Sequence, residues 1–147
     1  LLENILLPQV SQYNGTVTIV RGLPGNHTII PSSNMIRCYN HLSADELNNE
    51  MGKADFVISR SGYSTVMDLA ALQKKSILIP TPGQTEQEYL ADYLAKKRWA
   101  AVAVQKGFSL LQELEKAKQH NQRIGFSHDE TAELIAVIKL FVASLRQ

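Results

Sequence analysis

The sequence contains a single cysteine, Cys38, among its 147 residues. One cysteine excludes a disulfide within the chain and a zinc site built from cysteines. Cys38 lies in an apolar segment, which favours the role of a small core residue. The four histidines are scattered and show no metal-ligand spacing: His27, His41, His120 and His128. The sequence therefore indicates neither a disulfide scaffold nor a metal centre.

An excess of charge of either sign is also absent. The chain has 15 basic and 14 acidic residues, which leaves a formal net charge of +1. This balance argues against a nucleic-acid-binding protein that depends on a basic face. The one tight basic cluster, at 96–98, fits the solvated end of a helix, because cations are favoured at helix C-termini.

Long apolar runs are missing too, since none approaches the ~18 residues that suggest a membrane-spanning helix. No secretory leader is visible. The sequence opens without a methionine, inside a segment of helical periodicity, so we expect it to be one domain of a longer protein. Its length, with 44% hydrophobic and 20% charged residues, suits a single packed domain.

The sequence does contain a regular alternation of strand and helix patterns. Short runs rich in apolar and β-branched residues predict strands over 15–22, 35–40, 55–59, 76–80 and 100–105. Helical periodicity predicts helices over 1–12, 43–53, 64–73, 85–97, 109–119 and 129–147. Pro8 is expected to end or kink the first helix, Ser43 to open the second with a capping box, and Ser109 to open the fifth. The alternation predicts an α/β fold, a Rossmann-like doubly wound parallel sheet with helices on both faces.

The turn after the third predicted strand has the shape of an anion-binding site. Residues 59–65 read SRSGYST, with one glycine and no lysine, so they match neither a P-loop nor a dinucleotide fingerprint. The amides of Gly62, Tyr63, Ser64 and Thr65 would point out of the first helical turn, where the helix dipole favours an anion. The missing lysine argues for static binding of a diphosphate. An ordinary helix start without a ligand explains the same residues, and the turn alone does not separate the two.

Polar residues near this turn and in the next loop extend the candidate site. Asp68 lies about one helical turn after Ser64 and could accept hydrogen bonds from a ribose diol, although a carboxylate there also suits the helix dipole. The loop after the fourth predicted strand, PTPGQTEQEY, leads into a helix that opens with Glu86 and Gln87. The Gln87 amide has both donors and an acceptor for sugar hydroxyls, but a glutamine at such a position, taken alone, is more often an exposed surface residue.

Taken together, the two loops and their spacing resemble a known family. Residues 54–105 follow the pattern A-D-x-x-I-x-R-x-G, then an acidic residue six positions later, an apolar strand ending in proline, and a polar loop with an acidic residue and glutamine. This stretch resembles the C-terminal, donor-binding domain of GT-B glycosyltransferases. It is most similar to the MurG-like N-acetylglucosaminyltransferases of glycosyltransferase family 28. The resemblance implies one half of a GT-B fold.

The resemblance also implies a role for each candidate residue, with a nucleotide diphosphate sugar, most often UDP-linked, as the donor. The diphosphate would bind the turn Ser61, Gly62, Tyr63, Ser64 and Thr65. Asp68, where relatives typically have glutamate, would bind the ribose. Glu86 and Gln87 would contact the donor sugar, and Leu42 and Ser43 the base. No metal or other cofactor is expected, and no catalytic residue in this domain.

The chain departs from the family pattern at its beginning. Family domains start one strand earlier, with a glycine- or serine-rich loop that also touches the phosphates. In the family a separate N-terminal domain binds the acceptor and supplies the catalytic base. We therefore expect a first strand and a partner domain outside residues 1–147, peripheral membrane association through that domain, and a location in the cytoplasm or at the inner face of the membrane. The isolated domain is expected to be inactive.

Three functions remain open at this stage. The full-length protein is expected to be a glycosyltransferase that moves a hexose or N-acetylhexosamine to an acceptor hydroxyl. The alternatives are a split-subunit binding module that acts with a partner chain, and a GT-B-like sugar-nucleotide epimerase, which the lack of histidine in 54–105 disfavours. Arg60 either adds positive charge near the phosphates or ties the strand end to the sheet, and we favour the second role.

Overall fold

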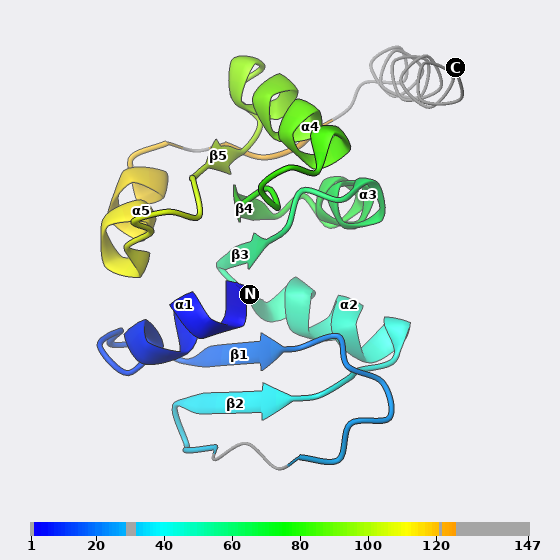
Figure 1. The fold of residues 1–147 in the computed structure, drawn as a ribbon, viewed down its shortest axis with the longest axis vertical. Helices are drawn as coiled ribbons and strands as arrows, with labels where there is room; N and C mark the ends of the chain where they lie inside the picture. The colour runs from blue at the N-terminus through cyan, green and yellow to red at the C-terminus, as the bar shows by residue number, and fades with distance from the viewer. Residues whose placement is uncertain (1, 29–31, 121, 126–147) are drawn as a thin grey trace.

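The computed structural model of the chain describes residues 2–28, 32–120 and 122–125 (Figure 1). All five predicted strands are present in this part of the chain. So are the first five predicted helices, each within a few residues of its predicted bounds. The helix predicted over 129–147 lies outside the described residues.

The described strands form two parallel ladders. One ladder pairs β1 with β2, and the other has the order β3-β4-β5 (Figure 1). The strand bounds are β1 Val17–Val20, β2 Ile36–Tyr39, β3 Phe56–Ser59, β4 Lys75–Leu78 and β5 Ala101–Val102. In register, Val17 lies opposite Ile36, Phe56 opposite Lys75 and Ile77 opposite Ala101. The predicted α/β class is confirmed, with its parallel strands divided between two ladders.

Five helices connect and cover these strands. Their bounds are α1 Leu2–Val10, α2 Ala44–Lys53, α3 Tyr63–Ala71, α4 Thr85–Lys96 and α5 Leu110–Lys118. Pro8 lies inside α1, which ends two residues after it. The predicted capping box opens α2, with the Ser43 hydroxyl accepting from the amide of Glu46 and the Glu46 carboxylate accepting from the amide of Ser43.

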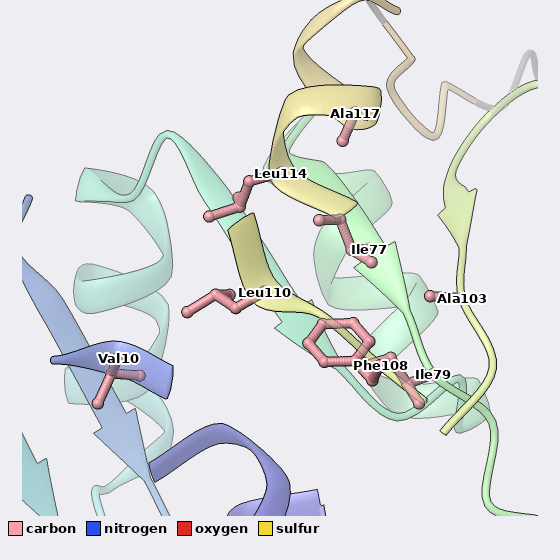
Figure 2. Packing of buried hydrophobic residues seen from close by; sticks show 8 residues of the cluster. All are labelled: Val10, Ile77, Ile79, Ala103, Phe108, Leu110, Leu114 and Ala117. Carbon is pink, nitrogen blue, oxygen red and sulfur yellow. The ribbon is translucent and has the colours of Figure 1, made fainter. Parts of the chain in front are cut away.

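The core is organised by the alternation of side chains along β4 and the residue after it. Ile77 and Ile79 lie on one face, in a cluster with Val10 of α1 and residues of α5 (Figure 2). Leu78 lies on the opposite face, in a cluster with residues of α2, α3 and α4. Ile77, Leu78 and Ile79 are all fully buried. Helices thus cover both faces of this ladder, as a parallel sheet requires.

A side chain from α1 caps the start of α5. Ser109 occupies the predicted N-cap position but makes no side-chain capping bond. The Gln9 Oε1 atom instead accepts from the amide of Leu110 at 2.8 Å, while its Nε2 atom donates to the carbonyls of Ile5 and Phe108 at 2.8 and 3.1 Å. One amide side chain therefore satisfies backbone groups in two helices that are distant in sequence.

Strands β1 and β3 each have one unpaired edge among the described residues. The amide of Val17 donates to the carbonyl of Met35, the residue before β2, and the carbonyl of Ser59 accepts from the amide of Ile79, the residue after β4. Because successive residues of a parallel strand direct their backbone groups to opposite sides, Thr18 and Val20 of β1, and Phe56 and Ile58 of β3, face away from their ladder partners. All residues of β1 and β3 are only half-buried, whereas three of the four in β4 are buried.

Candidate functional site

The candidate site lies at the carboxyl ends of β3, β4 and β5, where three loops meet. Arg60, the residue after β3, joins all three of them. Its Nη1 atom donates to the carbonyls of Ile79 and Pro80 at 3.0 and 3.1 Å, and its Nη2 atom donates to Gln105 Oε1 at 2.6 Å. The predicted role of Arg60 as a tie between the strand end and the sheet is confirmed.

Arg60 is also a charged group held partly out of water. Burial lowers the pKa of its guanidinium from the ordinary value, but arginine stays protonated at neutral pH. Its fixed positive charge therefore remains beside the loops while its hydrogen bonds are directed to carbonyl and amide oxygens. This charge adds to the electropositive character of the neighbouring helix start.

Helix α3 begins directly after Arg60 and Ser61, with no side chain to cap it. Gly62 is the N-cap residue, with φ −68° and ψ 149°, and the first bond back into the helix runs from the amide of Val66 to the carbonyl of Gly62 at 3.0 Å. The amides of Tyr63, Ser64 and Thr65 therefore precede the first helical bond. A Cβ atom at Gly62 would meet no atom within 4 Å, so the space beside this turn is open. The helix begins one residue earlier than predicted.

Ser61 has a structural bond that sequence reasoning did not identify. The residue is fully buried, and its hydroxyl donates to the backbone carbonyl of Gln87 at 2.8 Å. The bond connects the turn after β3 to the first turn of α4. Of the predicted diphosphate-binding residues, Ser61 is thus buried and bonded to the protein, whereas Ser64 is exposed and Thr65 is half-buried.

The Gln87 side chain is also occupied within its own loop. Its Oε1 atom accepts from the amide of Thr81 at 3.0 Å, and its Nε2 atom donates to Gln84 Oε1. Next to it, Glu88 Oε1 accepts from the amide of Gly83 at 3.0 Å, and Gly83 has a positive φ of 80°. These bonds shape the loop before α4. Contact between Gln87 and a sugar stays a prediction, and it would use the second N–H of Nε2 or the second lone pair of Oε1.

The predicted ribose and sugar carboxylates are exposed and form no ion pair with any described residue. Asp68 is exposed on α3 and Glu86 is exposed in the first turn of α4. Within the described part of the chain neither side chain has an ion pair with a basic residue. Both therefore remain available to a ligand, and their predicted roles are untested.

The predicted base-binding residues lie at the carboxyl end of β2, at the start of α2. Leu42 is half-buried and Ser43 is exposed. Ser43 donates to Glu46 Oε2 from its amide at 2.8 Å and from its hydroxyl at 2.7 Å, and these bonds lower the pKa of the Glu46 carboxyl. Since the cap uses both Ser43 donors, a base at this point would meet the backbone of Leu42 more readily than the Ser43 side chain.

The described residues contain no group of three or more His, Cys, Asp and Glu side chains placed to hold a metal ion. No helix in the described ranges is long and apolar enough to cross a membrane.

Comparisons with known proteins agree on one type of domain. The model of the glycosyltransferase family 28 C-terminal domain matches residues 37–139. A UDP-N-acetylglucosamine--N-acetylmuramyl-(pentapeptide) pyrophosphoryl-undecaprenol N-acetylglucosamine transferase from Haemophilus ducreyi is 30% identical over 111 residues, which cover 72% of this chain and 31% of the relative. The enzyme of that name from Desulforudis audaxviator is 42% identical over 83 residues, covering 55% of this chain and 19% of the relative.

A solved structure supports the same fold. The glycosyltransferase SnogD from Streptomyces nogalater aligns with a TM-score of 0.53 and 13% identity, over 88% of this chain and 36% of SnogD. At that identity the likeness concerns the fold alone. The chain spans about a third of the Haemophilus relative, and less of the Desulforudis one. None of the relatives named here is an epimerase.

Proposed function

Because the chain belongs to the glycosyltransferase family 28 C-terminal domains, we propose that it binds the sugar donor of a transfer reaction. The donor is a nucleotide diphosphate sugar, and the full-length protein moves its hexose or N-acetylhexosamine to an acceptor hydroxyl. The observation that carries the proposal is the uncapped start of α3, with three amides ahead of its first helical bond, at the carboxyl end of β3.

The chemistry of this helix start suits a leaving diphosphate. As the bond between the sugar and the diphosphate breaks, negative charge develops on the phosphate oxygens. Backbone amides at Tyr63, Ser64 and Thr65 and the dipole of α3 stabilise that charge without moving, because Arg60 and Ser61 hold the turn in place. This arrangement requires no metal ion and no lysine.

The identity of the donor is inferred from relatives. Both matched enzymes carry UDP-N-acetylglucosamine in their names, which supports a UDP-linked donor here. Asp68 would accept from the ribose hydroxyls, Glu86 and Gln87 would contact the sugar, and the segment at Leu42 and Ser43 would meet the base. The acceptor hydroxyl and its catalytic base belong to the part of the protein outside this chain.

The rest of the protein also completes the sheet in this proposal. One strand, added between the open edges of β1 and β3, would join the two ladders into one parallel sheet. The attached acceptor domain would bring the protein to the inner face of the membrane, in the cytoplasm. A division of these parts between two subunits remains the alternative.

The first prediction tests donor binding directly. Calorimetric titration of UDP, GDP, dTDP and UDP-N-acetylglucosamine into the full-length protein is expected to show preferential binding of the uridine nucleotides, unchanged by EDTA. Asp68→Ala should weaken UDP about tenfold, because one bidentate contact to a hydroxyl pair contributes about 1–2 kcal/mol. Gln87→Ala should weaken the UDP-sugar more than UDP itself.

The control is Asp92→Ala, which removes an exposed carboxylate of α4 whose only described ion pair is with Lys96. It should leave the affinity for UDP unchanged. If no nucleotide binds the full-length protein, or if Asp68→Ala behaves like Asp92→Ala, the donor site is not where we place it.

A further inference from the structure

A second candidate site lies at the opposite end of the β3–β4 ladder. A cavity of about 480 Å³ opens there, within the range of ~300–1,000 Å³ typical of small-molecule sites. Its walls come from the start of β3, the connection between α3 and β4, and the segment that includes and follows the end of α5. It lies at the amino ends of the strands, whereas the donor site is at their carboxyl ends, and the two share no residue.

Four basic side chains and one acidic side chain line this cavity. The basic residues are Lys74, Lys75, Lys118 and Arg123, and the acid is Asp55. Lys118 is paired with Glu115 at 2.7 Å, so its charge is largely balanced. The other three cations have no carboxylate partner among the described residues. In a chain whose net charge is only +1, this is a local concentration of positive charge.

Two of these cations are held in place by groups that do not neutralise them. Lys74 Nζ donates to the carbonyls of Gly52 and Ala54, the latter at 3.0 Å. Lys75 Nζ lies 5.7 Å from the centre of the Phe56 ring, a cation–π contact. Both side chains are half-buried. Their charges are therefore fixed at the wall of the cavity in a partly desolvated position, where an anion gains more than it would at an open surface.

Hydrogen bonds fix the segments that form the wall of the cavity. Gln73 has a positive φ of 52° at the end of α3, and its Nε2 atom donates to the carbonyls of Ala70 and Ile124 at 2.9 and 3.0 Å. Ile124 is fully buried. These bonds fix the segment that follows α5 against the α3–β4 connection, so Arg123 and Lys75 are brought to the same cavity by the fold and not by side-chain flexibility.

We propose that this cavity binds a phosphate-bearing anion at a site separate from the donor site. Lysine ammonium and arginine guanidinium groups are the usual partners of phosphate oxygens in proteins. Three uncompensated cations around one cavity suit a group that carries more than one negative charge. A soluble phosphorylated molecule and the headgroup of an anionic lipid share this chemistry, and the experiment below distinguishes them.

The test measures pyrophosphate binding by calorimetry, with the full-length protein at low salt. The double variant Lys75→Glu/Arg123→Glu is expected to lose at least tenfold in affinity, and the milder Lys75→Gln/Arg123→Gln to fall between it and the wild type. Lys96→Glu/Lys116→Glu changes the net charge equally through exposed lysines of α4 and α5 and should bind like the wild type. Unfolding curves of all variants check that each is folded.

The outcome of this comparison is independent of the donor site. Pyrophosphate bound only at the start of α3 would be affected equally by the cavity variants and by their charge-matched controls, and that result would overturn the proposal, as would no binding at all. Co-sedimentation with phosphatidylglycerol and phosphatidylcholine vesicles identifies the source. If the wild type binds the anionic vesicles and the cavity variants do not, the ligand is a lipid headgroup. If the wild type binds pyrophosphate but no vesicles, the ligand is a soluble molecule.

Discussion

At the scale of single residues, the candidate site is shaped by three side chains that form hydrogen bonds within the protein. Arg60 joins its own loop to the two that follow β4 and β5, Ser61 connects the turn after β3 to α4, and Gln87 supports the loop before α4. Arg60 and Ser61 donate to oxygens of these loops, and Gln87 accepts from the amide of Thr81. Their contribution to function is therefore one of position, since they determine where the free amides of α3 point.

Replacement of Arg60 should lower both the stability of the domain and its affinity for the donor. Arg60→Met keeps much of the side-chain volume but leaves the carbonyls of Ile79 and Pro80 without a donor, so we expect a loss of about 2–4 kcal/mol in the free energy of unfolding. Donor affinity should fall as well, because the loops move. Urea denaturation and nucleotide titration measure the two effects. Arg98→Met, at an exposed arginine, should change neither, and equal behaviour of the two variants would contradict the role given to Arg60.

The capping box of α2 should make the stability of the domain decrease at acidic pH. Hydrogen bonds from Ser43 lower the pKa of Glu46 from its ordinary value of 4.5. A carboxyl with a lowered pKa in the folded state contributes stability above its unfolded pKa, and this contribution is lost as the pH falls through the folded pKa. Thermal unfolding between pH 7 and pH 3 should therefore show a smaller acid-induced decrease for Glu46→Gln than for the wild type. The melting temperature of Glu86→Gln, a change at an exposed residue of α4, should decrease on acidification as much as that of the wild type.

At the scale of elements, α1 and α5 are held together by one amide side chain and by the core. Gln9 lies between them, and Val10 shares a buried cluster with Leu110 and Leu114 (Figure 2). Since α1 is the first element of the chain and α5 the last one described, this contact connects segments about 100 residues apart. The stability of both helices thus depends on their partner more than on their own sequence.

Loss of the Gln9 side chain should show this dependence. Gln9→Ala removes the acceptor for the amide of Leu110 and the donor to Phe108, and should lower the free energy of unfolding by about 1–2 kcal/mol, as for other helix caps. Chemical denaturation gives the value. The matched change Gln12→Ala, at an exposed glutamine just after α1, should cost less than about 0.5 kcal/mol, the usual limit for a surface substitution. A similar cost for both would mean that Ser109 caps α5 in solution.

At the scale of the whole molecule, the main feature is a sheet in two parts. The unpaired edges of β1 and β3 leave backbone groups of Thr18, Val20, Phe56 and Ile58 without ladder partners in the part of the chain that the structure describes. Such edges are sites of pairing with other chains. They also explain why β3, an apolar strand whose sequence predicts burial on both faces, is half-buried throughout.

A protein extended at its N-terminus by the proposed strand should be more stable and less prone to aggregate. We expect the amides of Thr18, Val20, Phe56 and Ile58 to exchange with solvent rapidly in residues 1–147 alone and slowly in the extended protein. Amides paired within β4 should be protected in both. Hydrogen exchange followed by NMR measures each position. Fast exchange at these amides in the extended protein as well would show that the strand does not pair there.

Much of this architecture follows from local sequence patterns, and the remainder depends on contacts between distant residues. The strands and the capping box at Ser43 were predictable because β-branched runs and cap residues act over a few positions. The Arg60 tie was one of two interpretations, and its geometry decided between them. The bonds of Gln9, Ser61 and Gln87 join residues or backbone atoms that no spacing rule relates, so they appear only in three dimensions. A first strand outside residues 1–147 was expected, but the break between β1 and β3 was not, since strand patterns do not specify which strands are neighbours.

The divided sheet has a further consequence for how the domain could be controlled. Two unpaired parallel edges can be paired by a separate peptide as well as by a covalently attached strand. A peptide that binds only the folded domain stabilises it by RT ln(1 + [L]/Kd), which is about 2.7 kcal/mol at a hundred times its dissociation constant. The domain would then behave as one member of a two-fragment system, with its melting temperature set by the concentration of the other fragment.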